Sequence, residues 1–121
     1  MASSLHRDRF PKVLRLARSS QFVHVQEHGL KLFSQPFVAL AARNSLGVSR
    51  LGITVSKRVG NAVERSRIRR LIRELFRKKR HLFPKGLDLL VIAQPAMKEA
   101  DWAFLSHAFD ELGQKLQRSF E

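Results

Sequence analysis

The chain has 121 residues, of which 44% are hydrophobic, and it carries 23 Lys and Arg against 10 Asp and Glu, a formal net charge of +13. This length suffices for one domain with a single hydrophobic core. The absence of cysteine excludes disulfides and thiolate metal sites, and no apolar run approaches the roughly 20 residues that span a bilayer. Residues 1–80 hold 19 Lys and Arg against 4 Asp and Glu, whereas residues 81–121 hold 4 against 6. We therefore expect a globular protein that binds a polyanion, and no membrane, through its first two thirds.

The N-terminal residues 1–18 are predicted to form a basic arm, because five Lys and Arg occur there without a helical or strand period. Residues 1–9 lack the apolar core of an export signal, so we expect a cytoplasmic protein. The remaining residues, 19–121, are expected to form the single folded domain.

The first elements of that domain are predicted from caps and alternation. A short helix should begin at Ser19 or Ser20 and end at Glu27 or His28, before Gly29. Residues 37–42 are apolar throughout, which indicates a strand buried on both faces. Residues 50–56 alternate between apolar and polar or small side chains, which indicates a strand with one open face. The short linker between these two strands favours an antiparallel pair.

A long helix is expected next. Asn61 and Glu64 form a capping-box pattern, so the helix should begin at Ala62 and continue to Arg80, before Pro84. Its apolar residues recur at helical spacing and should be buried, and they are Ile68, Leu71, Ile72, Leu75 and Phe76. The side away from this stripe is dominated by Arg69, Arg73, Arg77 and Arg80, flanked by Arg67 and Arg70.

The C-terminal third completes the predicted fold. Residues 87–93 read as a third strand and residues 101–118 as a last helix, whose apolar stripe includes Trp102 and Phe109 as core residues. The predicted order is α-β-β-α-β-α. This order is typical of an α+β domain in which helices cover a small mixed sheet.

The arginines of the long helix indicate a nucleic-acid partner. Charged helix faces are usually solvated, but a solubilising face mixes signs, whereas here like charges stand three and four residues apart and repel one another. Arginine also suits bidentate contacts to phosphate and stacking on bases. A helix that reads the DNA major groove is disfavoured, because no helix-turn-helix spacing is present. A membrane-surface helix is disfavoured because the apolar stripe lies between two strands.

The run from Gly52 to Glu74, GITVSKRVGNAVERSRIRRLIRE, resembles the signature of the bacterial ribonuclease P protein subunit, and the resemblance extends over roughly residues 10–117. The family usually has Arg-Asn-Arg where this chain has Arg65-Ser66-Arg67. The main alternative is a ribosomal or other structural RNA-binding protein with a basic helix and a small sheet. The length of the signature favours the ribonuclease P family.

The resemblance implies a fold detail, a partner and a set of contacts. The strand at residues 50–56 should connect through the long helix to a parallel strand at residues 87–93 by a left-handed crossover, against the general rule. The protein should form a heterodimer with one catalytic RNA. This RNA should remove the 5′ leader from precursor tRNA, using Mg²⁺ that is held by the RNA and the substrate. The RNA contacts carried over are Lys57, Arg58, Asn61, Arg65, Ser66, Arg67, Arg69, Arg70 and Arg73. The leader, in a cleft between the first helix and the open sheet face, should meet Phe22, Arg15, Thr54 and Ser56.

The residues themselves show no catalytic constellation, which agrees with a catalytic centre in the RNA. No nucleophile with a base and no paired carboxylates are visible. Asp88 could be a lone functional carboxylate, but a strand-edge residue is the better interpretation. His24 and His28 have a spacing that zinc can use, yet no third ligand is suggested, so we expect a surface or RNA-facing pair and no protein metal site.

Overall fold

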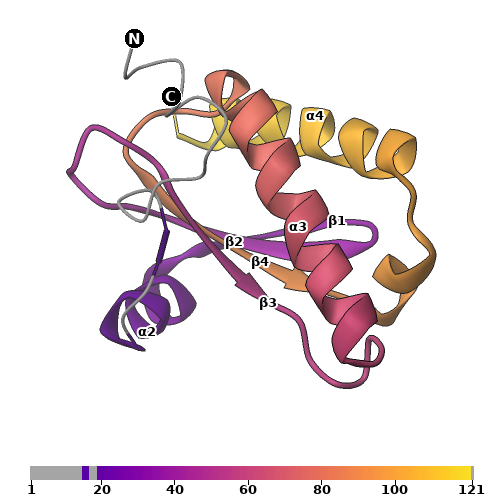
Figure 1. Ribbon diagram of the computed structural model, residues 1–121. Helices are drawn as coiled ribbons and strands as arrows, with labels where there is room; N and C mark the ends of the chain where they lie inside the picture. The colour runs from indigo at the N-terminus through magenta and orange to yellow at the C-terminus, as the bar shows by residue number, and fades with distance from the viewer. Residues whose placement is uncertain (1–14, 17–18, 121) are drawn as a thin grey trace, which may run out of the picture.

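The computed structural model describes residues 15–16 and 19–120, and it has the predicted α+β fold (Figure 1). Its elements are α2 (Ser19–His28), β1 (Leu30–Ser34), β2 (Phe37–Arg43), β3 (Arg50–Thr54), α3 (Ala62–Lys79), β4 (Leu87–Ala93) and α4 (Trp102–Ser119), with short 3₁₀ turns at Arg80–Leu82 and Pro95–Glu99. The strands form one four-stranded sheet in the order β1-β2-β4-β3. The boundaries of the helices agree with the prediction to within about two residues.

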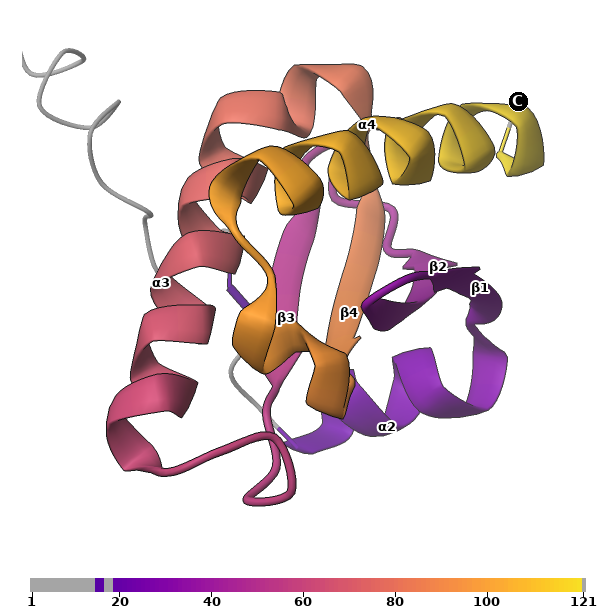
Figure 2. The ribbon, with the colours of Figure 1, turned by 90° about the vertical axis from the view of Figure 1, so that its right-hand side faces the viewer.

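Helices cover the sheet unequally. The views in Figures 1 and 2 place α3 and α4 on one side of the sheet and α2 on the other. The larger core lies under α3 and α4, where Leu89 and Val91 of β4 meet Ile72 and Phe109. The alternate residue Leu90 faces α2, where it packs in a small cluster with Leu16, Val25 and Leu40. The α2 side of the sheet is therefore only partly covered. Gly52 of β3 pairs with Leu90 of β4, so Arg50, Gly52 and Thr54 lie on this same side of the sheet.

The predicted pairing of the strands is wrong in one respect. β2 and β3 are not neighbours, because β4 lies between them, antiparallel to β2 and parallel to β3. Central strands are buried on both faces, and every residue of β4 except Ile92 is buried. The parallel β3-α3-β4 connection is thus confirmed, while its left hand stays a prediction.

Strand β1 was not predicted. It pairs antiparallel with β2 across the turn at Gln35 and Pro36 and forms one edge of the sheet. Its alternation is weak: Leu32 packs against the main core and Ser34 is buried, whereas Leu30 is exposed like Lys31 and Phe33. Pairing with β2, more than a hydrophobic pattern of its own, makes this segment a strand.

Helix α3 begins as predicted. The Asn61 side chain accepts a hydrogen bond from the Glu64 backbone N–H at 2.8 Å, and the Glu64 carboxylate accepts one from the Asn61 N–H at 2.9 Å. This capping box satisfies two backbone donors that would otherwise lack a helical partner. Four of the five residues of the apolar stripe are buried, and the fifth, Leu71, is half-buried.

One prediction about the ends of the domain is corrected. Trp102 is not a core residue, because 39% of it is exposed, whereas Phe109 is fully buried. Leu16 is buried against the sheet, with its N–H donating to the Leu51 carbonyl at 2.9 Å, so the packed part of the chain includes residues before Ser19. Residues 1–14 and 17–18 of the predicted arm lie outside the described residues. None of the helices in the described part of the chain is both long and apolar enough to cross a membrane.

Candidate nucleic-acid interface

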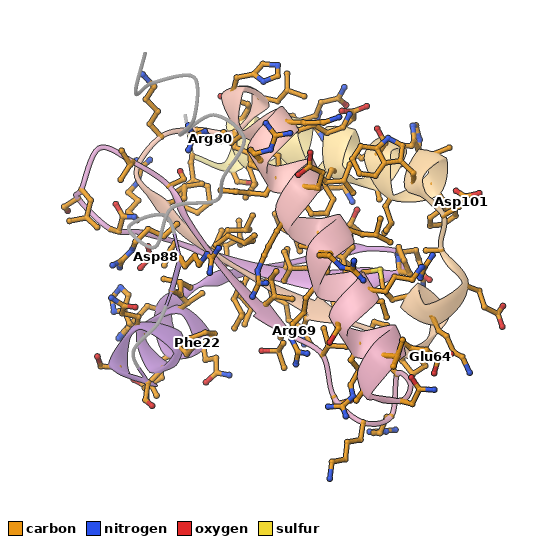
Figure 3. The ribbon with its side chains drawn as sticks, viewed as in Figure 1. Phe22, Glu64, Arg69, Arg80, Asp88 and Asp101 are labelled. Carbon is orange, nitrogen blue, oxygen red and sulfur yellow. The ribbon has the colours of Figure 1, made fainter. Side chains whose placement is uncertain are left out.

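The basic residues of α3 lie in two rows on either flank of its buried stripe. One row, here called the β3-side row, consists of Arg65, Arg69 and Arg73, spaced four residues apart, with Arg15 of the N-terminal segment beside it. A guanidinium nitrogen of Arg69 lies 3.5 Å from the Val55 carbonyl, so the side chain bends toward the end of β3 (Figure 3). Arg69 and Arg73, which were predicted on the side of α3 away from its apolar stripe, are both half-buried against the edge of the domain.

Mutual repulsion marks the β3-side row. Burial, followed by the positive charges of Arg15 and Arg69, lowers the pKa of Arg73. Arg65 has a buried Nε with no hydrogen-bond partner within the described chain. Like charges held together at a partly buried place raise the free energy of the unbound protein, and an anion placed there would lower it.

The other row, here called the α4-side row, consists of Arg67, Arg70 and Lys78. A guanidinium nitrogen of Arg67 donates to the Ala100 carbonyl at 3.3 Å, and Arg70 is exposed. Lys78 lies over the Trp102 ring, with Nζ 5.3 Å from the ring centroid. The sequence showed these cations but not their division into two rows, because the division depends on where β3 and α4 lie.

The carboxylates near α3 are bound to other cations. Glu64 pairs with Lys98 at 3.3 Å, Glu74 pairs with Arg77, and Asp110 pairs with Lys79 at 2.6 Å. No carboxylate of residues 15–16 and 19–120 forms an ion pair with the five arginines at positions 65, 67, 69, 70 and 73. The positive charges of these five arginines are thus not neutralised by an ion pair within the described part of the chain.

The predicted contacts before and at the start of α3 are accessible. Lys57 and Arg58 are exposed in the turn after β3, and Ser66 is exposed on the helix. The side-chain oxygen of Asn61 is used by the helix cap, which leaves its amide NH₂ for a ligand. Lys57 and Arg58 thus extend the basic surface of α3 to the turn that precedes the helix.

The predicted leader residues fall on the α2 side of the sheet, with one exception. Phe22 is half-buried and packs on the Leu16 cluster, and a Cβ at Gly52 would come within 2.9 Å of its ring. Glycine at position 52 thus lets the ring approach the strand closely. Thr54 and Ser56 are exposed near this side. Arg15 instead lies close enough to Arg73 for its positive charge to contribute to the lowered pKa of Arg73, so it joins the β3-side row.

A hollow at the other end of this side was missed from the sequence. It has a volume of about 380 Å³ and is lined by Ser20, Gln21, His24, Arg43, Asn44, Ser45, Arg50 and Asp88. Arg43 is exposed there, and Arg50 is held by Asp88. The two arginines are isolated in the sequence, so no local pattern could have placed them together.

The two candidate metal or catalytic positions have structural explanations. Asp88 is not a strand-edge residue, because it lies on the central strand β4, is 2% exposed and binds Arg50 and Asn44. His24 and His28 are exposed, with ring centroids 5.0 Å apart. Across the described ranges, no three His, Asp or Glu side chains form a group that could hold a metal ion.

Comparison with known proteins identifies the family. The family model described as Ribonuclease P matches residues 10–117. The chain belongs to the ribonuclease P protein family. Among curated relatives, the ribonuclease P protein component of Syntrophus aciditrophicus is 39% identical over 90 residues, covering 72% of this chain and 76% of the relative. The ribonuclease P protein component of Escherichia coli O139:H28 is 39% identical over 104 residues, covering 85% of this chain and 87% of the relative.

Solved structures of ribonuclease P proteins have the same fold. The Staphylococcus aureus protein matches with a TM-score of 0.77 at 30% identity, covering 91% of this chain and all of that one. The Thermotoga maritima protein matches with a TM-score of 0.72 at 31% identity, covering 86% and 96%. As a ribonuclease P protein component, the chain takes part in tRNA processing as the protein of an endoribonuclease ribonucleoprotein, together with an RNA subunit.

Proposed function

We propose that this ribonuclease P protein binds the catalytic RNA through α3 and the 5′ leader of precursor tRNA through the α2 side of its sheet. One protein and one RNA form the working heterodimer, and the RNA holds the catalytic centre. The protein raises the affinity for substrate and supports Mg²⁺-dependent cleavage, without a catalytic residue of its own and without DNA as a substrate.

The observation that carries this proposal is the set of five arginines on α3 without an ion-pair partner among the described residues. Arginine presents a planar fork of donors that matches phosphate oxygens, and each neutralised phosphate releases a counterion. The two rows of α3 lie on different flanks, so the helix can contact backbones on both sides. A structured RNA has phosphates close enough together to meet this need.

The α2 side of the sheet supports the second contact. Phe22 keeps part of its ring accessible above Gly52, and base stacking on an aromatic ring favours unpaired nucleotides of any sequence. Exposed Thr54 and Ser56 can donate hydrogen bonds to a backbone that passes along β3. A single-stranded leader fits this surface better than a duplex, since only an unpaired base can reach the ring.

Protein side chains do not fit Mg²⁺ here. Mg²⁺ needs oxygen ligands in octahedral geometry, usually one or two carboxylates with substrate phosphates. The buried carboxylate of Asp88 is already bound by Arg50 and Asn44, and the described chain has no grouped acids. We therefore assign the metal to the RNA and the substrate, and no chemical step passes through a protein-bound ion.

Reconstitution tests the proposal. Precursor tRNA is incubated at low Mg²⁺ with the protein alone, with a bacterial ribonuclease P RNA alone, and with both. We expect the 5′ leader to be removed efficiently only in the third reaction. Cleavage at the same site by highly purified protein alone would overturn the assignment of catalysis to the RNA. Tight RNA binding without any stimulation of cleavage would instead favour a structural RNA-binding role.

A further inference from the structure

Trp102 is the only tryptophan of the chain, and it lies at the first residue of α4 beside α3. It is 39% exposed although it continues the apolar stripe of α4, whose later members Leu105 and Phe109 are fully buried. Asp101 caps the helix just before it by accepting a hydrogen bond from the Phe104 N–H at 2.9 Å, so the backbone at this position is well held (Figure 3). A large aromatic ring is thus presented at a fixed place on the surface.

The ring forms one wall of a hollow between α3 and α4. The hollow has a volume of about 380 Å³ and is lined by Arg67, Arg70, Leu71, Glu74 and Trp102. The Arg67 guanidinium is held at its rim by the Ala100 carbonyl, and the Lys78 ammonium lies 5.3 Å from the Trp102 ring centroid. The lining therefore combines an aromatic wall, an aliphatic floor and a basic rim.

These groups fit an unpaired nucleotide. Every base has a π-face that can stack on an indole, and the arginines at the rim can bind the adjoining phosphates. Glu74 is the only carboxylate of the lining, and both of its oxygens accept hydrogen bonds from Arg77, so only their remaining lone pairs face a base. An acidic peptide would meet the rim equally well but would leave the ring without a stacking partner, so nucleic acid is favoured.

We propose that the hollow between α3 and α4 binds an unpaired nucleotide of the ribonuclease P RNA, with its base stacked on Trp102 and its phosphates on Arg67 and Arg70. This inference rests on the proposed function, and it adds a base contact to an interface otherwise made of backbone contacts. The hollow lies on the opposite flank of α3 from the β3-side row, so the RNA would reach both flanks of the helix.

The emission of Trp102 reports on this hollow directly, because no other tryptophan contributes. The full-length protein is titrated with a bacterial ribonuclease P RNA at constant Mg²⁺, and binding is measured in parallel by filter retention. We expect strong quenching of the emission that saturates with binding, and reduced access of acrylamide to the ring in the complex.

Substitutions test whether the ring contributes to binding. Trp102→Leu should weaken RNA affinity about 10-fold, within the range for loss of one stacked base, while Trp102→Phe should stay close to wild type. Trp102→Leu should leave the salt dependence of binding unchanged, since no phosphate contact is lost, whereas Arg70→Ala should reduce the slope by about one unit. Phe104→Leu is the matched control, because Phe104 is 52% exposed on α4 and does not line the hollow. It should bind like wild type.

The outcomes separate this inference from the proposed function. Failure of the wild-type protein to bind the RNA would overturn both. Normal binding without quenching, or quenching with full affinity in Trp102→Leu, would overturn the nucleotide site alone and leave Trp102 as a packing partner of Lys78.

Discussion

Arg50 and Asp88 form a bidentate ion pair between the first residues of the neighbouring parallel strands β3 and β4. Arg50 Nε lies 2.8 Å from Asp88 Oδ1, and a terminal nitrogen of Arg50 lies 2.7 Å from Oδ2. The hydrogen bonds to Asp88 raise the pKa of the Arg50 guanidinium. Asn44 donates to the same Oδ1 at 2.8 Å and also to the Val48 carbonyl, so the pair ties the β2-β3 loop to the sheet.

Asp88→Asn should destabilise the protein by about 3 kcal/mol, because a charged partner is left in a largely buried place. The Asp88 side chain is 3% exposed and that of Arg50 is 17% exposed, so solvent compensates little. Chemical denaturation measures the change. Asp110→Asn is the control. The Asp110 side chain is 43% exposed and that of its partner Lys79 is 19% exposed, so this ion pair should contribute less than about 1 kcal/mol to the free energy of unfolding. Equal effects of the two substitutions would contradict the structural role of Asp88.

The capping box at the start of α3 predicts a pH-dependent stability. The hydrogen bond from the Asn61 N–H, and then the nearby Lys98, lower the pKa of Glu64. A carboxylate with a depressed pKa stabilises the folded state above its unfolded pKa, about 4.3, and this contribution is lost as the pH falls through the lower folded value. We therefore expect the urea midpoint of the wild type to exceed that of Glu64→Gln at neutral pH, and the gap to close in acid. A gap that does not change with pH would show that the charge of Glu64 is not involved.

The β3-side row should control the salt dependence of RNA binding. If Arg69 and Arg73 each neutralise a phosphate, Arg69→Ala with Arg73→Ala should reduce the slope of log affinity against log salt by about 1.5 to 2 units. Removing two exposed cations away from α3, with Lys85→Ala and Arg118→Ala, provides the matched control. Binding isotherms at several salt concentrations give the slopes. Identical slopes for the two double variants would mean that the row is not at the interface.

Phe22 should distinguish precursor from mature tRNA. Phe22→Ala should lower the affinity of the reconstituted enzyme for precursor tRNA by about 1 to 3 kcal/mol, the range for one stacked base, with little effect on mature tRNA. The defect should persist at saturating protein, whereas loss of Arg67 and Arg70 should be overcome by excess protein because assembly is weakened. Val23→Ala is the control, since Val23 is 46% exposed on the same helix. Thermal unfolding of each variant separates packing from binding: a large loss of stability with both tRNAs affected alike would assign Phe22 to the core.

Local patterns determined the helices, the β3 alternation and the family. The cap at Asn61 and the stripe from Ile68 to Phe76 needed only the spacing of neighbouring residues, because a helix repeats every 3.6 residues whatever surrounds it. The signature from Gly52 to Glu74 is also a continuous stretch of chain. The identity of the basic residues on α3 was therefore predictable, but their burial and their division into two rows were not.

Partners distant in sequence decided the rest. Strand β1 exists because β2 offers it an edge, and Asp88 is buried because β4 lies between β2 and β3, neither of which is visible in local periodicity. Trp102 follows the stripe of α4, yet the core ends before it reaches the ring, so the same pattern yields a buried Phe109 and an exposed Trp102. The sequence determined which residues carry charge and aromatic area. Only the packing of α3 between β3 and α4 determined that the basic residues of α3 form two rows. One row contacts the end of β3 and the other contacts the start of α4, and both of these elements are remote from most of α3 in the chain.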